Sequence, residues 1–71
     1  MSIIVNLDVV LGMRKITLHE LSEKVNVPEK DLKTFAKGKM AAIDVKLLEA
    51  ICRELDCQPG DLLEFNFDEN I

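Results

Sequence analysis

The sequence predicts a small, mainly α domain of five helices flanked by two short strands that pair as an antiparallel sheet. Apolar residues recur at helical spacing along most of the chain, and residues that start or stop helices fall between those stretches. Short strand-like runs lie at the two ends. With 71 residues the chain has room for one domain, 1–71, and a domain of this size buries only about 60% of the surface of its unfolded chain.

The two ends of the chain are predicted to pair with each other. Residues 3–5 are β-branched and too few for a helix, and residues 64–67 alternate so that Phe65 and Phe67 share one face. Each run is the available partner of the other. We expect residues 68–71 to fray.

Asn6 is predicted to cap a first helix over about residues 7–14. The residues expected to face the core are Leu7, Val10 and Leu11. Val9 and Met13 lie on the opposite side, where solvent is expected. They are either scattered surface residues or part of a contact with another subunit.

Asp44 is predicted to cap a fourth helix over about residues 45–55, and Pro59 to open a short fifth helix that ends at Leu63. Asp56 and Cys57 form the turn between them. The residues of the fourth helix expected to face the core are Val45, Leu48, Ile51, Cys52 and Leu55.

The middle of the chain, about 17–38, is predicted to form two helices joined by a tight turn. Thr17 and Glu20 have the spacing of a capping box at the start of the second helix. Asn26 suits the left-handed conformation that ends a helix, and Pro28 favours the start of the next one. Gly38 ends this third helix, which covers about residues 29–37.

The third helix is predicted to be amphipathic. Its apolar side holds Leu32, Phe35 and Ala36. Its opposite side holds Lys30, Lys33, Thr34 and Lys37, and Lys39 continues the basic stripe. A short helix with one Lys/Thr face, after a capped helix and a brief turn, suits a major-groove reading element.

Charge is distributed unevenly around a net value of −4. Residues 14–39 carry seven basic and four acidic side chains, whereas residues 40–71 carry two basic and eight acidic ones. The two-helix unit is therefore basic although the protein as a whole is acidic, and a nucleic-acid partner is not excluded.

The chain shows no arrangement expected of an enzyme or a metal protein. Cys52 and Cys57 are five residues apart, which matches neither a redox nor a zinc spacing, and we expect free thiols. There is one His and no Ser/His/Asp set or Gly-rich phosphate loop. We expect no catalysis, cofactor, metal or small-molecule ligand. Without a signal peptide, membrane-spanning run or lipidation motif, we expect a cytoplasmic protein that does not bind membranes.

The chain resembles the Cro/cI-type (XRE-family) helix-turn-helix transcriptional regulators, in particular a small single-domain subgroup. The resemblance covers about residues 3–68 and includes the segments ITLHELSEKVNV, KGK and IDVKLLEAICRELDCQPGDLLEF. It implies a five-helix lambda-repressor-like fold, usually dimeric, with the third helix in the major groove. It also implies a dimer interface at the fifth helix and C-terminal segment, residues 62–67.

The sequence departs from that family pattern in three places. Leu18 replaces a Gln that commonly contacts phosphate, and Ala41 and Ala42 occupy a loop where basic residues are frequent. The third helix begins with Pro28, Glu29, Lys30 and Asp31 instead of a Ser cap and polar or basic residues. Each change removes a favourable interaction with a polyanion.

Candidate DNA contacts are therefore assigned by position on the helix-turn-helix. Lys33 and Thr34 lie mid-face and are the expected base-edge contacts. Phosphate contacts are expected from Lys30, Lys37, Lys39, and near the start of the second helix from Thr17 and His19. The alternative for the lysines is an ordinary solvated face. For His19, which has no carboxylate or Cys at a meaningful spacing, a surface residue is the preferred interpretation and the phosphate contact is the alternative.

Glu29 and Asp31 flank the predicted reading face. As acidic residues in a first helical turn they favour the helix dipole, and Glu29 has the spacing to pair with Lys33. The alternative is that one of them accepts a hydrogen bond from cytosine N4.

Two functions are consistent with these observations. The preferred one is a sequence-specific DNA-binding regulator that binds double-stranded DNA as a homodimer. The alternative is a helix-turn-helix fold used for protein interaction, as an antirepressor or assembly partner with weak or no DNA binding.

Overall fold

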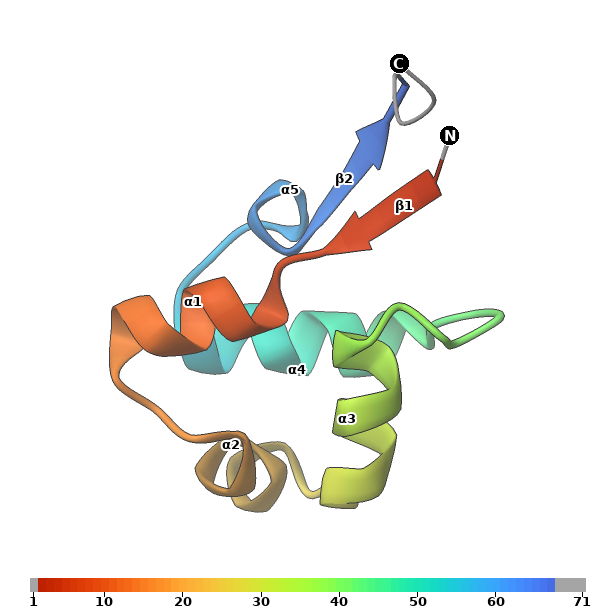
Figure 1. Cartoon of the computed structure of the whole chain (residues 1–71). Coiled ribbons are helices and arrows are strands. Elements are labelled where there is room, and N and C mark those ends of the chain that lie inside the picture. Colours follow the sequence, from red (N-terminus) through yellow and green to blue (C-terminus); the bar gives the residue numbers. More distant parts are fainter. Residues whose placement is uncertain (1, 68–71) are drawn as a thin grey trace.

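The computed structural model describes residues 2–67. Five helices form one body, and a two-stranded sheet extends away from it (Figure 1). The elements in chain order are β1 (Ser2–Val5), α1 (Leu7–Arg14), α2 (Leu18–Val25), α3 (Glu29–Ala36), α4 (Val45–Leu55), α5 (Pro59–Leu62) and β2 (Leu63–Asn66). The predicted fold class is confirmed, and each observed helix boundary lies within one residue of its predicted position. Residues 68–71, which we expected to fray, lie outside the described part of the chain.

The sheet joins the two ends of the chain as predicted. β1 and β2 run antiparallel, with Ile3 opposite Phe65 and Val5 opposite Leu63. Both strands begin one residue earlier than predicted, and β2 ends one residue earlier.

Asn6 connects the sheet to the first helix, but its side chain does not cap that helix. The backbone of Asn6 has φ −104° and ψ 29°, not the extended conformation from which a cap side chain reaches the first helical N–H groups. Its Nδ2 instead donates to Glu64 Oε1 at 2.8 Å. The predicted side-chain cap is therefore wrong, and Asn6 ties α1 to β2.

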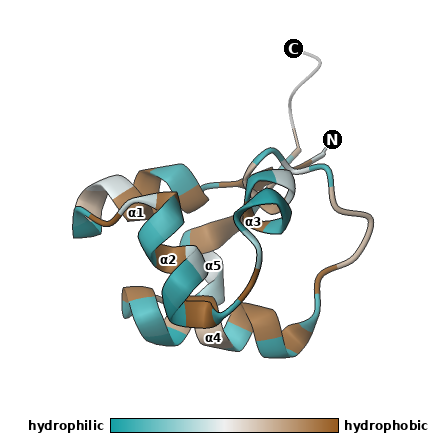
Figure 2. Ribbon diagram, turned by 90° about the horizontal axis from the view of Figure 1, so that it is seen from below, coloured by the Kyte–Doolittle hydropathy of each residue, from teal (hydrophilic) through white to brown (hydrophobic). Residues whose placement is uncertain are grey.

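The core draws on all five helices. In Figure 2 hydrophobic and hydrophilic segments alternate along the helices, as amphipathic helices around a shared core require. α2 packs on both α3 and α4, and α1 packs on α4 and α5. Among the described residues, the buried hydrophobic side chains are Leu7, Val10, Leu11, Leu21, Leu32, Phe35, Ile51, Leu55 and Leu62. The predicted inward face of α1 is thus confirmed, and Val9 and Met13 are exposed as expected.

Helices α1 to α4 all end in the same way. A residue in the left-handed conformation follows each helix, and the next N–H donates to a carbonyl five residues earlier. The left-handed residues are Lys15, Asn26, Gly38 and Asp56. The corresponding bonds, each 3.1 Å long, run from Ile16 to Leu11, Val27 to Ser22, Lys39 to Thr34 and Cys57 to Cys52. Asn26 and Gly38 confirm the sequence-based stop signals.

Helix α4 differs from prediction in one core residue. Asp44 caps it as predicted, because Asp44 Oδ1 accepts the Lys46 N–H at 2.9 Å. Val45, however, is 66% exposed, whereas Leu47 packs against the core. The predicted inward position of Val45 is therefore wrong. Val45 is the first residue of the helix and lies beyond the stretch that packs against other elements.

The two cysteines are free, as predicted. Burial, and secondarily the neighbouring Cys52, raises the pKa of the Cys57 thiol. A raised pKa keeps a thiol protonated and weakly nucleophilic at neutral pH. Cys52 packs against the core, in keeping with its predicted role as a small hydrophobe.

Gly12 offers a direct test of local helix stability in α1. A Cβ at this position would meet no atom within 4 Å, and the residue lies inside the helix. We expect Gly12→Ala to raise the free energy of unfolding by up to about 1 kcal/mol, because alanine loses less backbone entropy in a helix. Urea titration followed by circular dichroism measures the change. Unchanged or lowered stability would contradict an unstrained helical backbone at this residue.

Candidate nucleic-acid interface

The start of α2 is held by the predicted capping box. Thr17 Oγ1 accepts the Glu20 N–H at 3.0 Å, and the Thr17 N–H donates to Glu20 Oε1 at 2.9 Å. The Thr17 backbone N–H, followed by the Thr17 side chain, lowers the pKa of Glu20, so the carboxylate is ionised at neutral pH. Thr17 therefore sets the start and orientation of α2.

A three-residue turn leads from α2 to α3. Asn26 adopts the left-handed conformation with φ 58°. Pro28 directly precedes α3, and its carbonyl accepts from the N–H groups of Asp31 at 3.0 Å and Leu32 at 3.3 Å. The proline thus supplies the first acceptor of α3 at a place where its missing N–H costs nothing.

Helix α3 has a buried side and an open side. Leu32 and Phe35 are in the core, and Ala36 packs against it. The opposite side forms a shallow surface hollow lined by Glu29, Lys30, Lys33, Thr34, Lys37 and Lys39. The structure therefore brings together five of the seven predicted contact residues. An eight-residue helix is about 12 Å long, comparable to the width of the major groove.

Three lysines of this hollow carry uncompensated charge. Within residues 2–67, Lys30, Lys37 and Lys39 form no ion pair with a carboxylate, and all three are exposed. Thr34 Oγ1 donates to the Lys30 carbonyl at 3.1 Å. Its hydroxyl hydrogen is therefore used, and the hydroxyl oxygen can still accept a hydrogen bond.

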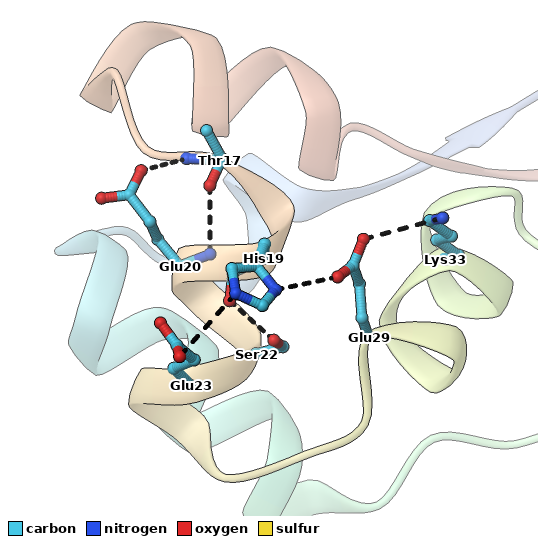
Figure 3. Close-up of polar contacts among 7 residues, drawn as sticks. All are labelled: Thr17, His19, Glu20, Ser22, Glu23, Glu29 and Lys33. Atoms are coloured by element: carbon cyan, nitrogen blue, oxygen red, sulfur yellow. Dashed lines mark hydrogen bonds and ion pairs between the residues drawn. The ribbon is translucent and has the colours of Figure 1, made fainter.

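Polar contacts link α2 to α3 beside the hollow (Figure 3). His19 Nδ1 lies 3.1 Å from Glu29 Oε1, and His19 Nε2 lies 3.7 Å from Glu23 Oε2. Lys33 Nζ lies 3.6 Å from Glu29 Oε2, which confirms the predicted pairing. The expectation that His19 has no carboxylate neighbour is wrong. Glu23 lies four residues further along α2, and the loop between α2 and α3 brings Glu29 close to His19.

Comparison with known proteins identifies this arrangement. A family model described as the Cro/C1-type HTH DNA-binding domain matches residues 6–68. The chain belongs to this family. The resemblance noted from the sequence is therefore confirmed, and α2, the turn and α3 are the helix-turn-helix of a Cro/C1-type DNA-binding domain.

Two similar proteins extend the comparison. The chain is 49% identical over 70 residues to a protein of Bacillus subtilis (strain 168) named "Uncharacterized HTH-type transcriptional regulator YozG", covering 99% of this chain and 83% of that protein. It is also similar to the crystal structure of the transcriptional regulator VanUg, with a TM-score of 0.73 and 28% identity. That match covers 89% of this chain and 83% of the other.

Two predicted contact residues of this Cro/C1-type domain lie outside the hollow. Thr17 forms the capping box. His19 does not line the hollow, but it contacts Glu29, which does. The sequence offered a signal for the Glu23 contact, because residues four apart on a helix face each other. It offered none for the contact with Glu29 on the next helix.

Arg14 has a structural role that was not predicted from the sequence. Its Nε donates to the Leu55 carbonyl at 2.7 Å, and its Nη2 donates to the Asp56 carbonyl at 3.0 Å. The guanidinium thus satisfies carbonyls at the end of α4. Although Arg14 contributes to the basic count of the middle segment, it stabilises the contact between α1 and α4.

Over residues 2–67, no helix has the length and apolar character needed to cross a membrane. In the same part of the chain, no three side chains of His, Cys, Asp or Glu are grouped so that they could hold a metal ion. The hollow on α3 is the candidate functional surface because it gathers exposed lysines of the helix-turn-helix.

Proposed function

We propose that this protein is a sequence-specific transcriptional regulator that binds double-stranded DNA as a homodimer, with α3 in the major groove. The observation that carries the proposal is the positive charge of Lys30, Lys37 and Lys39, which form no ion pair within residues 2–67, beside Thr34 on the open side of α3. The location of these side chains at the third helix of a Cro/C1-type domain further supports the proposal.

The residues divide into two kinds of contact. Lys33 and Thr34 lie at the middle of the open side and are assigned to base edges. Phosphate contacts are assigned to Lys30, Lys37 and Lys39, and to Thr17 and His19 near the start of α2. The rest of the chain is acidic and repels DNA, so the helix-turn-helix is the surface that attracts it.

A dimer interface is assigned to exposed apolar residues of the sheet and to Phe67, which directly follows β2. Leu62, at the start of the segment expected to form the interface, is fully buried in the monomer core. Ile3, Phe65 and Phe67 are 58%, 43% and 72% exposed, and the two Phe rings pack edge to face with centroids 4.5 Å apart. A second copy would remove this apolar surface from water.

Selection of bound duplexes from a random library tests the function. We expect enrichment of a near-palindromic site whose half-sites are about 10 base pairs apart, one per protomer. If Lys30, Lys37 and Lys39 of each protomer contact phosphate, log affinity should fall with log salt concentration at a slope of about −5.

Two outcomes would contradict the proposal. Failure to enrich any duplex at low salt, together with capture of a protein partner, would favour the protein-interaction alternative. Enrichment of a single unrepeated half-site would contradict binding as a symmetric dimer.

A further inference from the structure

The pair formed by Glu29 and Lys33 differs from the other charges of the hollow. Glu29 lies at the first position of α3, where the helix dipole stabilises its negative charge. Its two carboxylate oxygens have different partners: Oε1 lies 3.1 Å from His19 Nδ1, and Oε2 lies 3.6 Å from Lys33 Nζ (Figure 3). The carboxylate is therefore held from α2 and from α3 at the same time.

This arrangement alters what Lys33 offers to DNA. An isolated lysine attracts any phosphate, because its ammonium is a point charge on a flexible stem. The carboxylate of Glu29 offsets part of that charge, since a phosphate that is attracted by Lys33 is repelled by Glu29. The pair consequently contributes little to non-specific affinity, in contrast to Lys30, Lys37 and Lys39.

The pair still presents a donor and an acceptor side by side. Both residues line the hollow, with side-chain exposures of 60% for Lys33 and 37% for Glu29. In a G·C base pair the guanine O6 acceptor and the cytosine N4 donor lie a hydrogen-bond length apart, about 2.9 Å. This is close to the 3.6 Å between Lys33 Nζ and Glu29 Oε2.

We propose that Glu29 and Lys33 act as one unit that reads a single G·C base pair in the major groove. Lys33 donates to guanine O6 and N7, and Glu29 accepts from cytosine N4. His19 is a positioning residue that holds the carboxylate through Nδ1. The assignment rests on the proposed DNA-binding function and adds the base pair that this part of the helix recognises.

An A·T pair fits the same unit less well. Thymine offers one acceptor, O4, beside a C5-methyl group, whereas guanine offers two acceptors on one edge. The ammonium of Lys33 therefore gains more from guanine, and the methyl group gains nothing from either charged side chain.

The test uses the selected duplex and single base-pair variants of it, with wild-type protein and Glu29→Gln. We expect Glu29→Gln to lower discrimination at one G·C pair by about 5-fold or more, because its neutral amide oxygen is a weaker acceptor than the carboxylate. Because Lys33 is then free to contact phosphate, the salt slope should steepen by about one unit per protomer.

Two further variants separate this role from a structural one. Glu49→Gln is the matched control, since Glu49 pairs with Lys46 at 3.8 Å on α4, outside the hollow. It should change neither discrimination nor slope. His19→Ala should lower discrimination at the same G·C pair without steepening the salt slope, because the carboxylate and the ammonium both remain. Loss of the phosphate contact assigned to His19 should in addition weaken binding equally on every duplex.

A modified duplex tests the same contact without altering the protein fold. N4-methylcytosine at the assigned pair places a methyl group where Glu29 would accept, and wild-type affinity should fall by about the same factor as for a wrong base. In Glu29→Gln the modification should have a smaller effect.

Three results would overturn the assignment. Retained discrimination by Glu29→Gln, together with unchanged wild-type affinity for the N4-methylcytosine duplex, would remove Glu29 from base reading. Loss of discrimination by Glu29→Gln at an A·T pair, in place of a G·C pair, would refute the assigned base. Equal weakening on every sequence would show that the pair only supports the helix. In each case salt-dependent binding by the wild type would leave the proposed function intact.

Discussion

Charge reversal at Lys30 is expected to weaken DNA binding by about 10- to 100-fold at low salt, because a phosphate attraction becomes a repulsion on each protomer. The fold should be unaffected. Lys30 is the second residue of α3 and forms no ion pair within residues 2–67, and glutamate in a first helical turn is favourable. Fluorescence anisotropy with the selected duplex measures affinity, and thermal melting measures the fold.

The matched control for Lys30→Glu is Arg53→Glu. Arg53 is an exposed basic residue on α4 and does not line the hollow on α3. The two variants carry the same net charge, so a general electrostatic effect would weaken both. Equal losses of affinity, or no loss for Lys30→Glu, would contradict the assigned interface.

Truncation of Leu21 is expected to lower the free energy of unfolding strongly. Leu21 lies on α2, is fully buried and belongs to the core against which α3 also packs. Leu→Ala at such a site costs about 2–5 kcal/mol, whereas a chain of 71 residues is stable by only about 4–11 kcal/mol. Leu21→Ala should therefore lower the melting temperature by at least about 10 °C.

Val45→Ala is the control for this prediction. Val45 is also an apolar residue of a helix, but it is 66% exposed. Its truncation should change the free energy of unfolding by less than about 0.5 kcal/mol. A loss at Val45 as large as that at Leu21 would mean that the first turn of α4 packs against the domain. Calorimetry or denaturant titration distinguishes the two results.

Most of the secondary structure could be predicted because its determinants are close in sequence. The Thr17–Glu20 box closes within one helical turn, and Asn26 and Gly38 end helices through their own backbone conformations. Lys15 and Asp56 end helices in the same conformation, although neither residue type strongly favours it. There, the surrounding packing selects a conformation that the sequence alone does not indicate.

The candidate site was predictable in part for the same reason. The position of Lys30, Lys33, Thr34 and Lys37 on one side of α3 follows from helical periodicity, and the structure confirms that they share a hollow. The pairing of Glu29 with Lys33 also follows, since the residues are four apart. That His19 holds the other oxygen of Glu29 could not be predicted, because this contact depends on the angle between α2 and α3.

The sequence by itself determined the helices, the turn between α2 and α3, and the basic face of α3, because each depends on residues within a few positions of one another. The tertiary structure decided which residues those elements bring together. It placed Arg14 on the carbonyl of Leu55, 41 residues away, and Asn6 on Glu64, 58 residues away. It also left Val45 exposed. Periodicity defines the faces of a helix, but the elements packed against that helix decide which parts of those faces are buried.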